Sequence, residues 1–591
     1  MATVDPYLTY RFDSLLAEGQ SEGFSFNEEP PLLPMLVRFR EARDAASGFE
    51  GNDIRVSSRI GDIVSCLGTF EGLIALQRDP RILSIEASRP SSGNDCSVSV
   101  PFVHGDLVHN DPLNPEKGDN ALIAVIDSGI DVLHEAFRDD NGDTRIAALW
   151  DQKDPTGPGP TIPGSTSYGT LYSKSDINGF IYSGAVPPNL GRDTEGHGTH
   201  VTSIAAGRRT AKFAGGVAPE ARILVVLSRI KVNPQDTFSI GYSSSHVDAL
   251  AFIEQEATRL TLPVAVNVSQ GMNAGAHDGT SALESAFDNF SGGGRTPGRV
   301  IVKSAGNERK WSGHSRFYVP SRTVDELRID STVGHVGPDV FELWFRACDE
   351  FRFSVIDPNR NASHSVDAGE SVDAYFPSGV RYQMGYEKFH WDNGDSRLIV
   401  TISRGKSLQI PPGEWIIVIE GVSVQSEGII HAWVERDPSR PVRFINHLWE
   451  DFTLSIPATA RTVISVGSVT SSFPLKVARD SSFGPTRDNR QKPDIVAPGV
   501  GITAAEAGTA DDVCSMSGTS MAAPHVTGAV ALLLSQREKQ MKAKSGAPLR
   551  QFNAAQIRAA LCQTTQNYNG HSSSSMGYGL LDIRKLLDSF S

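Results

Sequence analysis

Alternation between strand-like and helix-like segments governs what this chain of 591 residues can fold into. Four runs dominated by apolar residues have the length of buried strands: Ala121–Ile126, Ile223–Leu227, Val264–Val268 and Val300–Ser304. Three segments between them have helical patterns: His197–Ala206, His246–Arg259 and Ser281–Phe290. Continuous apolar strands that alternate with helices are typical of a parallel sheet buried on both faces. We therefore expect an α/β domain, a parallel sheet sandwiched by helices, built from residues 121–312 and 441–591.

Other parts of the chain break this alternation. Residues 34–88 combine strand and helix patterns and predict a small α+β domain. Residues 313–440 contain strand-like runs separated by turn residues, without a helical pattern, and predict an all-β insert such as a jelly roll. Residues 1–33 are expected to be irregular, and residues 89–120, rich in Ser, Asn, Asp and Pro, to form a linker. A loop insertion is expected near 150–190.

Composition limits the partners and the compartment. The formal net charge of −14 argues against nucleic acid or an anionic membrane as the main partner. The five cysteines are scattered without a CxxC pair, which favours free thiols over a disulfide scaffold. The first residues do not form a basic start followed by an apolar run, and no apolar stretch approaches a membrane span. A cytoplasmic protein is expected, with secretion left open.

The residue types needed for serine catalysis stand at the ends of predicted elements. Asp127 ends one apolar run and Asn307 follows another, while His197 and Ser520 each begin a helix. Histidine titrates near neutral pH and can take the proton of a serine, a carboxylate can orient it, and fixed donors can hold an oxyanion. Loops at the carboxyl ends of parallel strands converge on one crevice, so these side chains are expected to meet.

The segments that carry these residues resemble the subtilisin-like serine proteases. In chain order they are ALIAVIDSGID (121–131), EGHGTHV (195–201), SAGNE (304–308) and SGTSMAAPHV (517–526). Three further segments match the same family: GVAPEARI (216–223), KPDIVAPGV (492–500) and GYGLLDIRKLL (577–587). The resemblance implies a serine endopeptidase in which Asp127 orients His197, His197 is the general base, Ser520 is the nucleophile and Asn307 donates to the oxyanion.

The same resemblance implies where a protein or peptide substrate would bind. Three residues, Ser269, Gln270 and Gly271, match the strand that pairs with an extended peptide, and three others, Ser304, Ala305 and Gly306, match the pocket for the side chain before the cut. Glu308 could stand at the rim of that pocket and favour basic side chains, although a solvated glutamate is the favoured interpretation.

The regions outside the α/β domain also have counterparts in the family. Residues 34–87 resemble its inhibitory propeptide, whose tail, beginning here near Ala87, would lie in the active-site cleft, so the chain's own N-terminal domain is an expected partner. The alternative is an unrelated small α/β unit. The all-β insert and the absence of a leader resemble the layout of clostridial spore-germination subtilases.

No metal or other cofactor is expected. Many subtilisins bind calcium through an aspartate shortly after the catalytic one and a loop after the histidine, but the first position here is Ala136 and the loop at 207–216 is basic. The acidic run at 139–143 is interpreted as a solvated turn, and His134, His200 and His525 as packing or hydrogen-bonding residues.

Two other functions remain as alternatives. A catalytically silent subtilase used as a binding scaffold is one, although all four catalytic positions are filled. An esterase is the other, but it would use a Gly-x-Ser-x-Gly turn, and the second glycine is replaced by Ala522.

Overall fold

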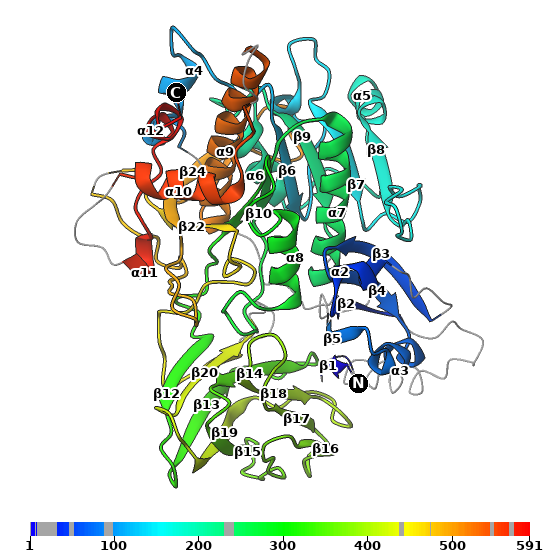
Figure 1. Ribbon diagram of the computed structural model, residues 1–591, viewed down its shortest axis with the longest axis vertical. Coiled ribbons are helices and arrows are strands. Elements are labelled where there is room, and N and C mark those ends of the chain that lie inside the picture. The colour runs from blue at the N-terminus through cyan, green and yellow to red at the C-terminus, as the bar shows by residue number, and fades with distance from the viewer. Residues whose placement is uncertain are drawn as a thin grey trace.

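The computed structural model describes residues 2–5, 8, 32–46, 53–87, 99–229, 242–435, 442–472, 474–543, 549–566 and 573–590. These residues form three parts, which are side by side in Figure 1. The α/β domain is at the top, the N-terminal domain (strands β1 to β5) lies beside it, and the β domain (β12 to β21) lies below both.

A sheet of eight strands in the order β23-β22-β11-β10-β6-β9-β7-β8 forms the centre of the α/β domain. Its strands are β6 (Leu122–Asp127), β7 (Ile146–Asp151), β8 (Thr170–Ser173), β9 (Arg222–Leu227), β10 (Val264–Val268), β11 (Arg299–Ser304), β22 (Ile464–Val469) and β23 (Ile495–Pro498). Neighbouring strands are parallel except β7 and β8. The predicted parallel sheet is confirmed.

Helices cover both faces of this sheet (Figure 1). The helices α6 (His197–Ala206) and α9 (Thr519–Ala543) pack on one face, and α7 (Tyr242–Leu260) and α8 (Ala282–Phe290) on the other. Alternate residues of β6 enter the two cores, because successive strand side chains point to opposite faces. Shorter elements complete the domain: η1 (Pro101–Val103), α4 (Gly105–His109), η2 (Glu135–Phe137), α5 (Lys174–Ser183), β24 (Ile502–Ala505), β25 (Val513–Met516), α10 (Ala554–Thr564), α11 (Ser573–Met576) and α12 (Ile583–Asp588).

Two predictions for irregular segments are wrong within the described residues. The expected loop near 150–190 contains β8 and α5, whose first turn is capped reciprocally by Ser173 and Asp176. The expected linker at 89–120 contains η1 and α4. Their apolar side chains join the core that α9 also fills, so burial overrides a loop-like composition.

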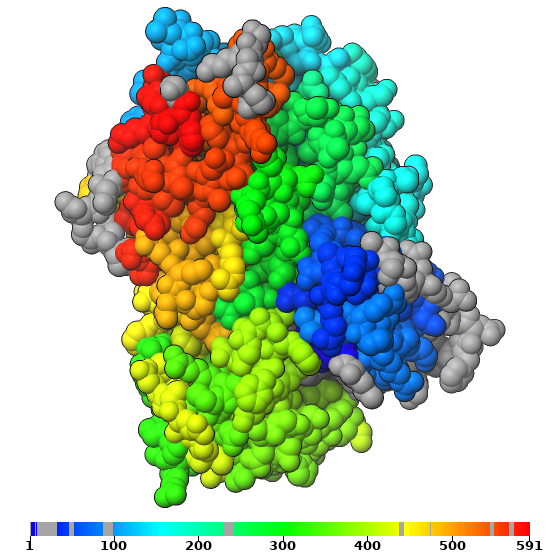
Figure 2. All heavy atoms as spheres, viewed as in Figure 1, coloured from blue at the N-terminus to red at the C-terminus, as the bar shows by residue number. Residues whose placement is uncertain are grey.

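The N-terminal domain is a sheet in the order β1-β5-β2-β4-β3 with two helices. Its elements are β1 (Thr3–Val4), β2 (Leu33–Phe39), α2 (Ala42–Ala46), β3 (Ile54–Ile60), β4 (Ile63–Gly68), α3 (Phe70–Arg78) and β5 (Ile82–Ala87). Leu36, Ile60 and Ile63 pack into the core formed with α7 and α8, while α3 covers other residues of the sheet. Figure 2 shows this domain in the angle between the α/β domain and the β domain.

The β domain consists of two antiparallel sheets packed around one core. One sheet contains β12 (His314–Tyr318), β20 (Ile429–Val434), β14 (Asp339–Phe345), β18 (Ser396–Ser403), β17 (Arg381–Glu387) and β16 (Ser371–Tyr375). The other contains β15 (Glu350–Ile356), β19 (Gly413–Ser423), β13 (Val324–Ser331) and β21 (Val442–Phe444). Because β21 pairs with β13, this domain extends past the predicted boundary at residue 440.

Candidate active site

The three predicted triad residues come from three elements that meet at the carboxyl end of the sheet. Asp127 is the last residue of β6, His197 is the first residue of α6, and Ser520 lies in the first turn of α9. His197 Nδ1 is 2.6 Å from Asp127 Oδ1, and the Ser128 backbone N–H donates to the same oxygen at 2.8 Å. The carboxylate therefore holds the imidazole in one orientation.

Gly198 allows the start of α6 to pack closely against the end of β6. A Cβ atom on Gly198 would lie 1.9 Å from the Gly129 carbonyl oxygen and 3.1 Å from Asp127 Cβ. Any larger residue would displace His197 from the carboxylate, so the HGT sequence at the start of α6 is required by packing.

Burial and charge act in opposite directions on His197. Burial alone would lower the pKa of its imidazole, but the adjacent Asp127 carboxylate more than offsets this, and the pKa lies above the usual 6.5. A histidine in this state is a stronger base at neutral pH than a free imidazole, which suits removal of a serine proton.

In this structure the Ser520 hydroxyl is hydrogen-bonded to a backbone carbonyl rather than to His197. Ser520 Oγ donates to the Ser269 carbonyl oxygen at 3.1 Å, and Ser269 Oγ donates to the Ser520 carbonyl at 3.0 Å. Within the described part of the chain, His197 Nε2 is buried and has no hydrogen-bond partner. The imidazole nitrogen is thus available to take a proton, as a general base requires.

The amide of Asn307 is held by the start of the nucleophile helix. Its Oδ1 accepts from the Thr519 backbone N–H at 3.1 Å and from Thr519 Oγ1 at 3.2 Å. Because a backbone N–H can only donate, the atom that faces it is the amide oxygen. The Nδ2 group therefore points away from Thr519 and remains available as a donor beside Ser520.

The two predicted substrate segments border the same helix start. Ser269, Gln270 and Gly271 follow β10, and Ser304, Ala305 and Gly306 end or follow β11. The first segment contacts Ser520 as described, and the Gly306 N–H donates to Thr519 Oγ1 at 3.1 Å. Both segments therefore contact the first turn of α9, one through Ser269 and the other through Gly306.

Two supporting residues were missed in the sequence. The Tyr242 hydroxyl donates to the Gln270 carbonyl at 2.6 Å, and Ser228 Oγ donates to Gln270 Oε1 at 2.9 Å. Ser228 precedes and Tyr242 follows a segment at 230–241 that lies outside the described residues. Neither residue stands in a recognisable motif. Only their position in space links them to the site.

Comparison with known proteins identifies the family of this chain. A family model described as "Subtilase family" matches residues 118–336 and 450–579, which is more than half of the chain. The chain belongs to the subtilase family. It is therefore a subtilisin-like serine peptidase by family, as the motifs predicted, and the unmatched stretch between the two ranges lies in the β domain.

Several subtilases are similar over most of this chain. The PI-type proteinase of Lactococcus lactis subsp. cremoris is 25% identical over 530 residues, covering 80% of this chain and 26% of its own length. The C5a peptidase of Streptococcus pyogenes serotype M3 (strain ATCC BAA-595 / MGAS315) is 24% identical over 454 residues, covering 72% and 35%. This chain thus spans about a quarter to a third of the length of these curated relatives.

One solved subtilase structure shares the fold. The CspB protease of Clostridium perfringens has a TM-score of 0.70 and 25% identity, covering 83% of this chain and 98% of that one. A clostridial protease therefore shares the fold of this chain over most of its length.

The interpretation of Glu308 as a solvated residue is wrong. Its side chain is 4% exposed, and its backbone N–H donates to Ser482 Oγ at 2.9 Å. The burial arises because Ser482, far along the chain, closes over the turn after Asn307. Burial lowers the pKa of the buried Lys303 overall, and the Glu308 carboxylate opposes this shift by favouring the charged ammonium.

The other polar residues near the motifs belong to the scaffold. His200 Nε2 lies 3.3 Å from the Cys514 carbonyl, His134 Nδ1 accepts from the Ala136 N–H, and His525 Nδ1 lies 2.8 Å from the Met521 carbonyl. Asp139 Oδ1 accepts from the backbone N–H groups of residues 141 and 143, as in an ordinary turn.

Neither metal binding nor location is decided by the geometry. Among the described residues, no group of three or more His, Cys, Asp or Glu side chains is placed to hold a metal ion. The absence of calcium stays a prediction. No helix in the described ranges is long and apolar enough to cross a membrane. The predicted cytoplasmic location gains no support from the relatives.

Proposed function

We propose that this subtilase is an active serine endopeptidase with Asp127, His197 and Ser520 as its triad and Asn307 as its oxyanion donor. The observation that carries this proposal is the 2.6 Å contact between His197 and Asp127, with the other imidazole nitrogen left unpartnered among the described residues. Other buried histidines, His200, His246 and His277, also leave one ring nitrogen unpartnered, but their other nitrogen contacts a backbone carbonyl, whereas that of His197 contacts a carboxylate.

The proposed reaction follows from these positions. The Ser520 hydroxyl turns from the Ser269 carbonyl to His197 Nε2, gives up its proton and attacks the peptide carbonyl. The oxyanion accepts from Asn307 Nδ2 and from the Ser520 backbone N–H at the start of α9. His197 then passes the proton to the leaving amine, the C–N bond breaks, and water hydrolyses the acyl-enzyme by the same route.

Substrate would bind as an extended strand. We assign pairing with its backbone to Ser269, Gln270 and Gly271, and the pocket for the side chain before the cut to Ser304, Ala305 and Gly306. Gly271 and Gly306 support this assignment because both segments approach Ser455 so closely that a Cβ atom on either glycine would lie within 2.7–2.8 Å of its side chain.

The N-terminal domain would act as an inhibitor that docks beside the cleft. Ser58 Oγ donates to Asp248 on α7 at 2.5 Å, and Glu86 Oε2 accepts from the Ala282 N–H at the start of α8 at 2.9 Å. A carboxylate at a helix N-terminus is a favourable contact. The predicted inhibitory tail begins near Ala87, and residues 88–98 lie outside the described ranges.

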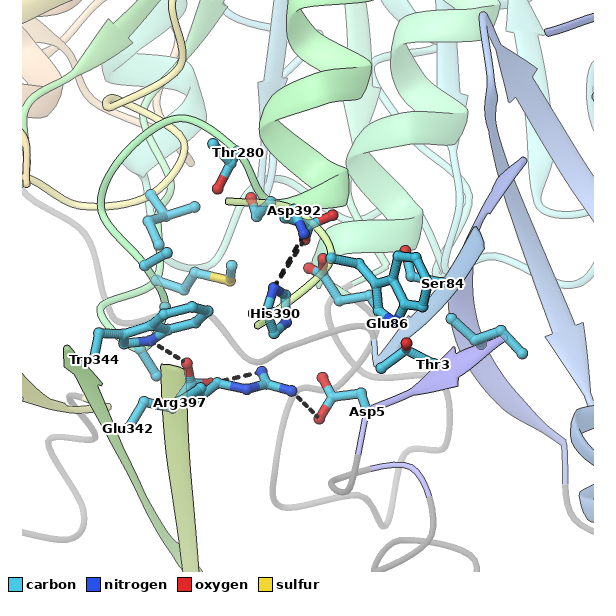
Figure 3. A pocket seen from close by; sticks show the side chains of 18 residues that line it. Thr3, Asp5, Ser84, Glu86, Thr280, Glu342, Trp344, His390, Asp392 and Arg397 are labelled. Atoms are coloured by element: carbon cyan, nitrogen blue, oxygen red, sulfur yellow. Dashed lines mark hydrogen bonds and ion pairs between the residues drawn. The ribbon is translucent and has the colours of Figure 1, made fainter. Parts of the chain in front are cut away.

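The β domain joins this docking interface. Arg38 Nη1 of β2 is 2.6 Å from Asp392, and the buried Arg397 faces Asp5 and Glu342 around a small cavity of about 40 Å³ (Figure 3). Such charge pairs between the N-terminal domain and the β domain favour one arrangement of the N-terminal domain, and removal of one partner would leave a buried charge.

A serine-directed fluorophosphonate tests the proposal. The wild-type protein should react and should hydrolyse an unfolded protein, and Ser520→Ala should do neither. A protein that binds peptides but reacts with no fluorophosphonate would instead be a silent scaffold. Hydrolysis of simple esters without hydrolysis of peptides would favour the esterase alternative.

A further inference from the structure

A lysine ammonium lies beneath the proposed pocket for the residue before the cut. Lys303 is the penultimate residue of β11 and is fully buried. Its Nζ donates to the Ser304 carbonyl at 2.6 Å, to Ser304 Oγ at 2.8 Å and to Ser455 Oγ at 3.2 Å. All three acceptors are neutral, and Lys303 makes no ion pair within the described part of the chain.

Ser455 forms the floor between the two walls of this pocket. A Cβ atom on Gly271 would lie 2.7 Å from Ser455 Oγ, and one on Gly306 would lie 2.8 Å from Ser455 Cβ. The two glycines therefore face the same serine from opposite segments. Lys303 Nζ reaches this floor through its hydrogen bond to Ser455 Oγ, so its charge lies near any side chain that enters between the glycines.

The Ser304 hydroxyl connects the ammonium to the pocket. Ser304 Oγ accepts from Lys303, and its own proton is donated to no group among the described residues. A serine hydroxyl has one donor and two acceptor sites, so this proton is available to an acceptor that arrives from the cleft. A cation behind the hydroxyl strengthens that donation.

A buried cation with only neutral acceptors favours a ligand that brings negative charge. Burial lowers the pKa of Lys303 from 10.5 to about 7, and the Glu308 carboxylate opposes this shift. Lys303 also acts on His246, whose pKa is lowered mainly by burial to about 4, so that its imidazole is neutral above pH 5. Among the described residues, no carboxylate is in ion-pair contact with the ammonium, and the Glu308 carboxylate acts on it only without such a contact.

We propose that the enzyme prefers an acidic side chain immediately before the cut, with Ser304 Oγ donating to the substrate carboxylate and Lys303 supplying the positive charge behind it. The preference rests on the endopeptidase function proposed above. It also differs from the preference for basic side chains that Glu308 suggested in the sequence, because Glu308 is buried and its carboxylate favours the charged form of Lys303.

Matched peptide substrates test this preference. The peptides differ only in the residue before the cut, which is Glu, Gln, Ala, Lys or Phe, and kcat/KM is measured at pH 6.5. The Glu peptide should exceed the Lys and Phe peptides by about tenfold or more, the usual effect of one charge-assisted hydrogen bond. Lys303→Met and Ser304→Ala should each lower the Glu-to-Ala ratio of kcat/KM at least tenfold.

The pH dependence of the wild type provides a second test that needs no variant. A substrate glutamate is ionised throughout pH 6–8.5, and the titration of His197 affects the Glu and Gln peptides equally. The Glu-to-Gln ratio of kcat/KM should therefore fall as the pH rises through about 7 and Lys303 loses its proton.

The possible failures are distinguishable. Hydrolysis of the Ala or Phe peptide as fast as the Glu peptide at pH 6.5, or a Glu-to-Gln ratio that is constant with pH, would overturn this inference and leave the endopeptidase in place. Absence of reaction with every peptide and with a fluorophosphonate would overturn the proposed function and this inference together.

Discussion

Replacement of Asn307 by alanine tests its proposed role as the oxyanion donor. The structure holds the Asn307 amide oxygen by two hydrogen bonds from Thr519, at 3.1 and 3.2 Å, so that Nδ2 needs no reorganisation to donate. Loss of one such preorganised donor costs about 2.7–4 kcal/mol of transition-state stabilisation, or about 10²–10³ in kcat, with little change in KM. Activity does not vanish, because the Ser520 N–H remains as a second donor.

The same substitution has a separate cost in stability. Asn307→Ala leaves the Thr519 N–H and hydroxyl without their shared acceptor, which is worth about 1–3 kcal/mol for a buried group. Asn307→Asp is the matched control, because a carboxylate keeps the acceptor for Thr519 but cannot donate to the oxyanion.

Steady-state kinetics on a peptide substrate, together with thermal unfolding, separate the two effects. Asn307→Asp should lose at least as much kcat as Asn307→Ala while unfolding closer to the wild type. A raised KM with unchanged kcat in either variant would refute the reasoning and make Asn307 a ground-state binding residue.

Three further predictions concern the base, the metal and the N-terminal domain. Because the pKa of His197 is raised above 6.5, kcat/KM should fall as the pH drops through a midpoint above 6.5, and a midpoint below 6 would contradict the assigned pair with Asp127. EDTA should change neither activity nor melting temperature, and a large drop restored by calcium would reveal a site missed around Ala136 and 207–216. Wild-type protein should run as two fragments on a denaturing gel through self-cleavage between about residues 87 and 110, and Ser520→Ala at full length; an intact wild type would exclude self-cleavage.

The sequence predicted those parts of the site that depend on short-range patterns. His197–Ala206 was predicted with its observed bounds, and Asp127 ends its strand as expected, because an apolar run that closes on a polar residue marks the end of a buried strand. Asn553 caps α10 in the way that asparagine favours at a helix start, since its side chain accepts from the Gln556 N–H at 2.9 Å.

The remainder depends on contacts between distant parts of the chain. Lys303 was predicted only as part of an apolar run, and its contact with Ser455 spans 152 residues and the whole β domain. The burial of Glu308 likewise depends on Ser482. Strands β7 and β8 were missed because their pairing partners and α5, rather than their composition, determine their conformation.

Intact mass after reaction with a fluorophosphonate tests the central claim most directly. One phosphonyl group should add to the wild-type protein, on the peptide that contains Ser520, and none should add to Ser520→Ala. Equal labelling of Ser520→Ala, or hydrolysis of an unfolded protein by that variant at more than a trace of the wild-type rate, would contradict the assignment of Ser520 as the nucleophile.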